Sequence, residues 1–205
     1  MLMSMPSRLR TALTDIPVIP GYIIPEQTLC EMWRHQLQGA GFRIGISWQG
    51  ERTYKGREKA SDVGRSVPLH LFAGIAAVAD VRLISLQKNE GVGQLATLPE
   101  TMKVETLGQD FDAGHDGFCD CAAVMKNLDL VITSDTAVVH LAGALGVPVW
   151  LALKKVPDWR WFQHRTDSPW YPSMRIFRQE TDGDWDQVFF EMESALRALT
   201  KKGAA

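Results

Sequence analysis

The stretch LDLVITSDTAVVHLAGALGVPVW, residues 128–150, constrains the fold of this chain more than any other part of it. It opens with an apolar run through Ile132, which has the length of a buried strand and is too short for an ordinary helix. Four residues whose side-chain oxygens can cap a helix follow, in the order TSDT. Residues 137–145 then have the pattern of a helix, Gly146 ends it, and residues 147–153 form a second apolar run. The stretch therefore predicts a strand, turn, helix and strand.

The start of that predicted helix is a candidate binding site for a phosphate group. The first backbone N–H groups of a helix have no partner within it and lie at the positive end of its dipole. His140 follows one turn beyond Thr136, which places an imidazole beside the same terminus. The Asp135 carboxylate would repel a phosphate, so we expect it to cap the helix or to accept from a ligand hydroxyl. The predicted site residues here are Asp135, Thr136, Ala137, Val138 and His140. A capped helix with a hydrogen-bonded histidine is the alternative that the spacing leaves open.

Strand and helix patterns alternate along the rest of the chain. The other predicted strands are residues 42–48, 81–86, 102–107 and 174–177, and the other predicted helices are residues 29–37, 68–78, 118–127 and 185–199. Such alternation predicts an α/β fold, a Rossmann-like parallel sheet with helices on both faces. Residues 1–40 are expected to form an extended, proline-containing segment and a linker helix, and residues 41–200 a single domain.

Several segments leave the strands at the edge where parallel sheets bind their ligands. Residues 49–67 form a long charged loop after the first strand, and Gln87 and Lys88 follow the second. A solvated loop is the alternative for residues 49–67. Residues 154–171 are rich in tryptophan and charge, which fits either a wall of a ligand cleft or a small hydrophobic cluster under a loop.

A G-x-G-x-x-A pattern at residues 91–96 is a weak signal for a dinucleotide site. Its glycines lie well beyond the end of the preceding strand, and the unit is not the first of the chain. We interpret them as the start of a helix. The alternative, a nicotinamide oxidoreductase, predicts NAD(H) binding that is lost in Gly93→Asp.

Composition excludes several classes of protein. With 205 residues and 45% hydrophobic side chains the chain can bury one core. A formal charge of -2 gives no basic field, so nucleic acid is not an expected partner. Three cysteines are too few for a disulfide framework and fit a reducing cytoplasm, and Cys119-Asp120-Cys121 lacks the further ligands of a zinc site. No apolar run is long enough to predict a transmembrane segment.

The segment SDTAVVHLAGALGVPVW resembles the donor-nucleotide motif of heptosyltransferase-like (family 9) glycosyltransferases. It is most similar to the glycosyltransferase domain at the C-terminus of many bacterial tetratricopeptide-repeat proteins. Further similar stretches are GISWQG at 45–50, GRSVPL at 64–69, ISLQK at 84–88 and VPDWRWFQHRTDSPWYPSMRIFRQ at 156–179. The resemblance covers about residues 40–199.

This resemblance implies the C-terminal, donor-binding half of a GT-B glycosyltransferase. It implies an inverting, metal-independent enzyme with no cofactor, whose partner is a nucleotide-diphosphate sugar donor. The phosphate contacts implied on the loop side are Gln49, Gly50, Lys55 and Arg65, with Gln87 and Lys88 on the same edge.

The resembled enzymes take their catalytic base and acceptor pocket from a first domain that has no counterpart here. We therefore name no catalytic residue, and the acceptor, a protein or a glycan, is unidentified. The chain is expected to be a fragment, to work with an N-terminal acceptor domain on a partner chain, or to bind donor without transferring it. The last alternative is a non-catalytic nucleotide-sugar-binding or scaffolding module.

Overall fold

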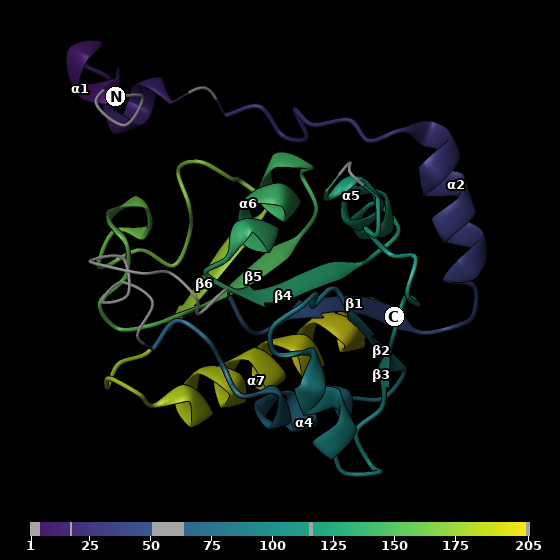
Figure 1. Cartoon of the computed structure of the whole chain (residues 1–205). Coiled ribbons are helices and arrows are strands. Elements are labelled where there is room, and N and C mark those ends of the chain that lie inside the picture. Colours follow the sequence, from purple (N-terminus) through teal and green to yellow (C-terminus); the bar gives the residue numbers. More distant parts are fainter. Residues whose placement is uncertain (1–4, 17, 51–63, 115–116, 204–205) are drawn as a thin grey trace.

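A six-stranded, fully parallel sheet forms the centre of the protein (Figure 1). The computed structural model describes residues 5–16, 18–50, 64–114 and 117–203. The strand order is β3-β2-β1-β4-β5-β6, so the chain winds outward from β1 in both directions. The strands are β1 (Phe42–Ser47), β2 (Val81–Ser85), β3 (Val104–Glu105), β4 (Leu130–Ser134), β5 (Val149–Leu153) and β6 (Met174–Arg178).

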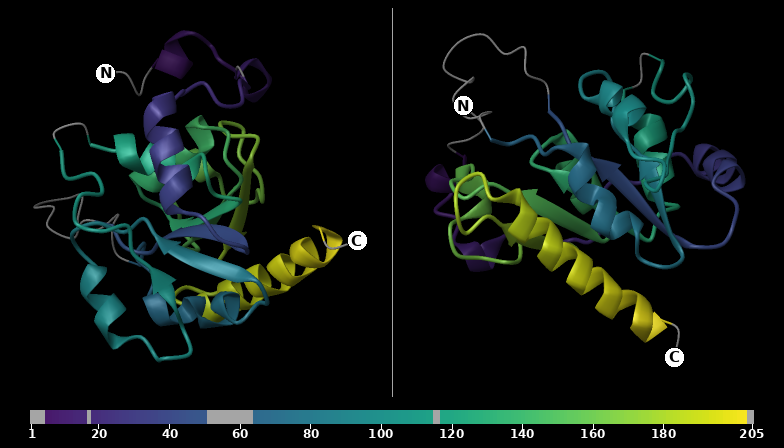
Figure 2. Two further views of the ribbon diagram at one scale, coloured as in Figure 1. Left: turned by 90° about the vertical axis from the view of Figure 1, so that its right-hand side faces the viewer. Right: turned by 90° about the horizontal axis from the view of Figure 1, so that it is seen from below.

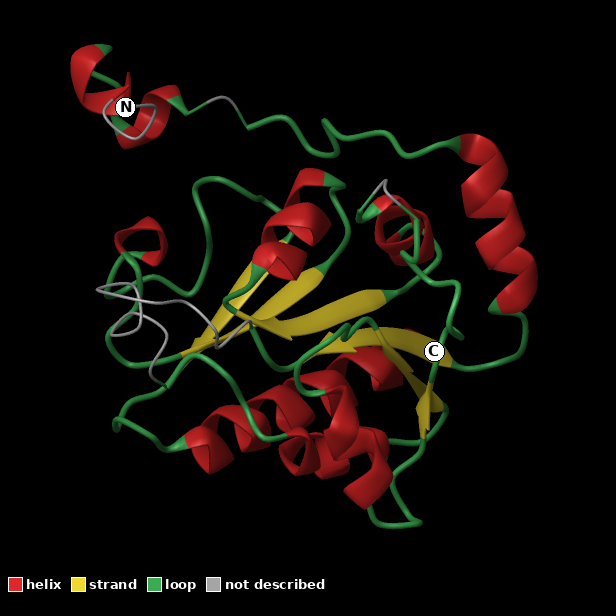
Figure 3. Cartoon of the chain, in the orientation of Figure 1, coloured by secondary structure: helices red, strands yellow, loops and turns green. Residues whose placement is uncertain are grey.

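Helices cover both faces of the sheet, as Figures 1 and 3 show. One face carries α2 (Gln27–Gln36), α5 (Cys119–Met125) and α6 (Ala137–Ala144), and the other carries η3 (Leu69–Phe72), α4 (Ala73–Ala76) and α7 (Trp185–Gly203). The remaining short helices are α1 (Met5–Arg8), η2 (Leu13–Asp15), η4 (Val92–Thr97) and η5 (Trp159–Trp161). The predicted α/β fold is confirmed. Among the helices of the described residues, none has the length and apolar character needed to cross a membrane.

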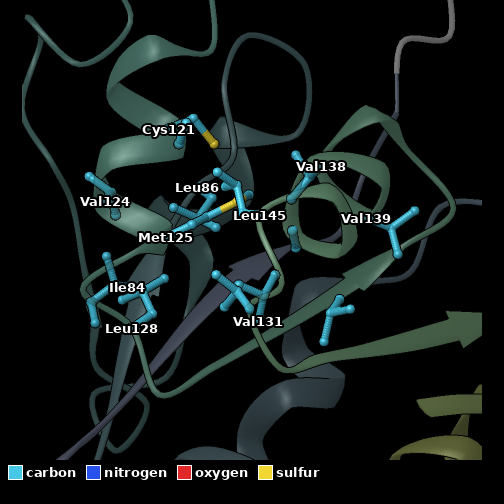
Figure 4. Packing of buried hydrophobic residues seen from close by; sticks show 14 of the residues in the cluster. Ile84, Leu86, Cys121, Val124, Met125, Leu128, Val131, Val138, Val139 and Leu145 are labelled. Carbon is cyan, nitrogen blue, oxygen red and sulfur yellow. The ribbon is translucent and has the colours of Figure 1, made fainter. Parts of the chain in front are cut away.

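The core between the sheet and α5 and α6 is closely packed (Figure 4). Val131 of β4, Met125 of α5 and Val139 of α6 are fully buried there. Gly45 allows this packing on β1, because a Cβ atom at that position would lie 2.4 Å from Leu128 Cδ1. Any larger residue at Gly45 would push the strand away from its neighbours.

The opposite face is closed by the long helix α7, which runs beneath the sheet (Figure 2). The residues predicted to form its apolar face are buried, namely Trp185, Val188, Phe189, Met192 and Leu196. Leu199 belongs to the same predicted face, but it is 44% exposed. The C-terminal turns of α7 therefore extend beyond the sheet, where there is no core for them to cover.

Three predicted elements have different boundaries in the structure. β4 continues through Thr133 and Ser134, where the sequence predicts a turn; both are buried and Thr133 pairs with Ser47 of β1. The predicted third strand is reduced to two residues, because only Val104 and Glu105 reach β2. The predicted helix 68–78 begins with a 3-10 turn.

The N-terminal segment lies across α6 before it reaches α2. The Ile23 N–H donates to the Ala144 carbonyl over 3.1 Å, and a Cβ on Gly21 would lie 3.1 Å from the Leu145 oxygen. The sequence predicts an extended segment here, and the structure shows that it packs on the C-terminal end of α6. In α2, Trp33 is buried and its indole N–H donates to Asp120 of α5 over 2.8 Å.

Candidate functional site

The carboxyl ends of β1, β2 and β4 enclose a cavity of about 540 Å³, which we call the switch-point cavity. It lies where the strand order reverses between β1 and β4, the position at which open α/β sheets bind ligands. Ten of the eleven residues predicted as a donor site line it: Gln49, Gly50, Arg65, Gln87, Lys88, Asp135, Thr136, Ala137, Val138 and His140. The eleventh, Lys55, lies outside the described residues. Segments about 85 residues apart in sequence are thus brought to one cavity.

Helix α6 presents its N-terminus to this cavity. Thr136 is the N-cap residue, in an extended conformation, and no side chain in the described part of the chain caps the helix. Of the two roles expected for Asp135, capping α6 is wrong, since Asp135 precedes the N-cap. The other role, accepting from a ligand hydroxyl, stays a prediction, and Asp135 lines the cavity. Ala137 and Val138 follow in the first turn, which carries no acidic side chain. An anion at this terminus would meet backbone N–H groups without a competing carboxylate in the helix.

Gln87 holds the exits of β1 and β2 together. Its side-chain oxygen accepts from the N–H groups of Trp48 and Gln49 at 2.9 and 3.0 Å and from the Ser47 hydroxyl at 3.2 Å. Its amide nitrogen donates to the carbonyls of Gln49 and Glu90, each over 2.8 Å. Gln87 lies at the cavity as predicted. Its side-chain amide, which was expected to contact the ligand, bonds to the surrounding backbone.

Arg65 and Gln49 line the part of the cavity next to the end of β1. The Arg65 guanidinium lies against Gly50, where a Cβ would be 2.8 Å from one of its nitrogens. Gln49 accepts from the Gln94 amide over 3.0 Å, which fixes its side chain at the rim. Glycine at 50 therefore allows the arginine to lie close to the backbone at the strand exit.

Lys88 also lines the cavity, but its ammonium group is partly engaged. It donates to the carbonyl oxygens of Phe111, over 2.7 Å, and Asp112. Two of its three N–H donors are thereby directed to the loop after β3. Lys88 thus ties that loop to β2 and keeps one donor for a ligand.

His140 and Asp135 are partly buried titratable groups at the same helix terminus. Burial lowers the pKa of the His140 imidazole, and the nearby Asp135 acts in the opposite direction. Burial raises the pKa of the Asp135 carboxyl, while Trp161, His140, Arg65 and Arg160 lower it. The Trp161 indole N–H is near this carboxylate without meeting the geometry of a hydrogen bond. Burial thus favours the neutral forms of both groups, while the attraction between them favours the charged forms.

Several cavity residues were not among the predicted site residues. Arg160, from the tryptophan-rich loop, adds a second arginine to the cavity, while Trp161 is buried and stacks on His140 at 5.1 Å between ring centroids. The loop therefore forms both the cleft wall and the hydrophobic cluster that the sequence offered as alternatives. Phe118 contributes an aromatic side chain that is 46% exposed and has a positive φ of 72°. The composition of residues 154–171 indicated such a wall, but which of its residues line the cavity, and the contribution of Phe118, depend on the path of the loops.

The glycine pattern at residues 91–96 has a structural role. Gly91 has a positive φ of 87° and is the N-cap of η4, which confirms the interpretation as a helix start. Its carbonyl accepts from the Trp48 indole over 3.3 Å, and a Cβ there would lie 2.9 Å from Gln49 Cβ. At Gly93, the second glycine of the pattern, a Cβ would meet no described atom within 4 Å. Across the described ranges no group of three His, Cys, Asp or Glu side chains is arranged to hold a metal ion.

No family model matches the sequence. A curated relative, protein FlbA of Caulobacter vibrioides, is 29% identical over 195 residues. The alignment covers 92% of this chain and 31% of that relative, so the chain spans less than a third of its length.

Solved structures with the same fold are glycosyltransferases. E. coli ADP-heptose lps heptosyltransferase II superposes with a TM-score of 0.62 at 16% identity, covering 94% of this chain and 57% of that one. The glycosyl transferase family 9 protein of Veillonella parvula DSM 2008 gives 0.55 at 13% identity, covering 86% and 45%. E. coli heptosyltransferase WaaC with ADP-2-deoxy-2-fluoro heptose gives 0.51 at 14% identity, covering 85% and 47%. At these identities the likeness establishes the fold, and this chain spans about half of each neighbour.

Proposed function

We propose that the chain is the donor-binding half of a GT-B glycosyltransferase, inverting and metal-independent, and that its ligand is a nucleotide-diphosphate sugar. The observation that carries this proposal is the convergence of ten predicted donor-site residues on one cavity at the uncapped N-terminus of α6. We assign donor binding to residues 41–200 and a linking role to residues 1–40. A reducing, cytoplasmic setting suits the three free cysteines.

The diphosphate would bind at the first turn of α6. The N–H groups of Ala137 and Val138 supply hydrogen bonds, and His140 lies one turn further along the same cavity. Arg65 and Arg160 add positive charge on the side of the β1 exit and the tryptophan-rich loop. When the glycosidic bond to phosphate breaks, negative charge grows on the leaving diphosphate, and these groups stabilise it without a metal ion.

The cavity lining also offers apolar and polar groups for the rest of the donor. Leu86, Phe118 and Val138 provide apolar surface suited to a nucleobase. Asp135 is buried beside the helix terminus, where its carboxylate can accept a hydrogen bond from a sugar hydroxyl. The acceptor and the catalytic base belong to a second domain or a partner chain in this proposal, so no residue of this chain is assigned as the base.

The proposal is tested with the purified protein and a panel of UDP-, GDP- and ADP-sugars, including ADP-heptose. Calorimetry is expected to give saturable binding of at least one donor, and slow release of its nucleoside diphosphate would identify an enzyme. Binding without any release of product, also in the presence of candidate acceptors, would identify the non-catalytic module. If no member of the panel binds, both functions are excluded for those donors, and NAD(H) binding that is lost in Gly93→Asp would favour the oxidoreductase.

A further inference from the structure

The imidazole of His140 is held by two other aromatic residues, Trp161 and Tyr171. Its Nδ1 lies 3.1 Å from the hydroxyl oxygen of Tyr171. The ring stacks on Trp161 with an interplanar angle of 19°, and it meets the Tyr171 ring edge to face at 5.8 Å. With Nδ1 occupied by Tyr171, the other ring nitrogen, Nε2, is the one left for the cavity that His140 lines.

Tyr171 is itself fixed against helix α6. A Cβ atom on Gly143 would lie 2.3 Å from Tyr171 Cγ, so the tyrosine ring fits directly onto the glycine backbone. The Tyr171 carbonyl accepts from the Met174 N–H over 3.1 Å, which joins the residue to the start of β6. Tyr171, which lies in the loop before β6, is therefore held against α6 and joined to the start of β6.

The N-terminal segment also lies near Tyr171. Tyr22, which is 56% exposed, is close enough to raise the pKa of the Tyr171 hydroxyl. Its neighbour Ile23 is tied to α6 through the Ala144 carbonyl. The N-terminal segment and α6 thus both pack near the tyrosine that contacts the His140 imidazole.

We propose that Tyr171 is a positioning residue that donates its hydroxyl proton to His140 Nδ1 and so keeps His140 as the Nε2–H tautomer, ready to donate to a phosphate oxygen. This inference rests on the proposed function for the phosphate, because a phosphate diester oxygen only accepts hydrogen bonds and requires a protonated nitrogen facing it. The hydrogen bond made by one ring nitrogen decides which nitrogen carries the proton in a neutral imidazole.

Burial supports the neutral ring that a tautomer requires. It lowers the pKa of His140 and raises the pKa of Tyr171 to about 12, so that Tyr171 keeps its proton at neutral pH. The charged groups around the imidazole are Asp135 and Asp158, which favour its protonation, and Arg160, which opposes it. At neutral pH and above, the pair is therefore a phenol facing an imidazole.

The tautomer can be read directly from the ligand-free protein by ¹⁵N NMR of the histidine side chains. The His140 signals are assigned by their loss in His140→Gln, and the exposed His164 serves as an internal reference. We expect the pattern of an Nε2–H ring for His140 in the wild-type protein at pH 8, and a shift toward a mixture of both tautomers in Tyr171→Phe. A wild-type ring protonated at Nδ1, or an unchanged pattern in Tyr171→Phe, overturns the proposal. The wild-type spectrum decides the matter even if the variant does not fold.

A second readout connects the tautomer to binding. Tyr171→Phe keeps the ring against Gly143 and removes only the hydroxyl, so we expect ADP to bind about threefold to tenfold more weakly. Tyr22→Phe removes a hydroxyl near Tyr171 and is expected to have a smaller effect. Unchanged ADP affinity in Tyr171→Phe contradicts the positioning role. A protein with the Nε2–H tautomer that binds no nucleoside diphosphate instead contradicts the proposed function and leaves the ring geometry correct.

Discussion

Two cavities of about 540 Å³ each open near the carboxyl edge of the sheet, and they differ in what their helix termini offer. The switch-point cavity lies at the N-terminus of α6. The second, which we call the β6-edge cavity, is lined by residues at the end of β6, by part of the loop after β5 and by the first turns of α7. Volume alone therefore does not distinguish them.

Among the described residues, the first turn of α7 has hydrogen-bond partners that the first turn of α6 lacks. The Gln187 N–H donates to Asp184 Oδ1 over 3.1 Å, and Asp186 adds a negative charge in the first turn. The Gln187 side chain is bonded to the Glu180 N–H and to Glu191. A helix terminus satisfied in this way has no attraction for a phosphate, whereas the uncapped α6 with Arg65 and Arg160 nearby has one. If α6 binds a diphosphate as proposed, its first-turn amides and the two nearby arginines are what distinguish it from α7.

Introducing one carboxylate at the start of α6 should cause the largest loss of nucleoside diphosphate affinity. Ala137→Asp places a negative charge at an exposed first-turn position, where it favours the helix dipole and leaves the fold intact. Two unit charges about 4 Å apart repel by about 4 kcal/mol at an effective dielectric constant of 20, so affinity for ADP or UDP should fall at least about 100-fold. Calorimetry measures the change. Gln187→Glu, the matched change in the β6-edge cavity, is expected to leave affinity unaltered, and equal effects of the two variants would contradict the comparison.

Removing one arginine should have the next largest effect. Arg160→Ala deletes a cation of the switch-point cavity and is expected to weaken nucleoside diphosphate binding by roughly 10- to 100-fold, as for a charge-assisted hydrogen bond. The control is Arg165→Ala in the β6-edge cavity, where the arginine is paired with Asp167 at 2.7 Å. Binding titrations at two salt concentrations separate the variants, and a loss of affinity in Arg165→Ala as large as that in Arg160→Ala would refute the assignment.

Gln87 should matter for stability as well as for binding. Gln87→Leu leaves the N–H groups of Trp48 and Gln49 without their acceptor, so we expect the free energy of unfolding to fall by about 1–3 kcal/mol. Gln187→Leu removes a glutamine with fewer bonds at the β6-edge cavity and should cost less than about 1 kcal/mol. Urea denaturation measures both. Similar losses would show that the Gln87 bonds contribute no more than surface ones.

The smallest expected effect concerns pH. The folded-state pKa of His140 is lowered, so the unfolded chain binds its proton more readily, and stability is lost as the pH falls below about 6.5. Asp135 acts oppositely, because its raised pKa lets the folded state take up a proton before the unfolded chain does. His140→Gln should therefore lose less stability than the wild-type protein between pH 7.5 and 5.5, by no more than about 1.4 kcal/mol per pH unit. The exposed His164→Gln should behave like the wild-type protein, and identical profiles for all three proteins would contradict the buried imidazole.

The sequence predicted the sheet and the edge of the site because both depend on local patterns. The apolar run ending at Ile132 and the helix pattern after it are confirmed as β4 and α6. Because the strands are parallel, the residues that follow β1 and β2 lie at the same edge of the sheet as the start of α6. The extension of β4 through Thr133 and Ser134 was missed, because their pairing with β1 and burial outweigh the turn tendency of hydroxyl side chains.

Roles that depend on contacts between distant segments could not be predicted. Lys88 was placed at the cavity, but the carbonyls that it binds belong to the loop after β3. Tyr171 is 31 residues from His140, and nothing in either local pattern indicates their contact. The donor role of the ten cavity residues stays a prediction, because the cavity provides their arrangement and not their ligand.

The binding of a diphosphate at the uncapped start of α6 is the central claim, and one titration tests it most directly. Each nucleoside and its diphosphate are titrated separately into the wild-type protein and into Ala137→Asp. The three pairs are adenosine and ADP, uridine and UDP, and guanosine and GDP. We predict that at least one diphosphate binds at least about tenfold more tightly than its nucleoside, and that Ala137→Asp removes this difference. Equal affinities within every pair, or a difference that survives in Ala137→Asp, would contradict the claim.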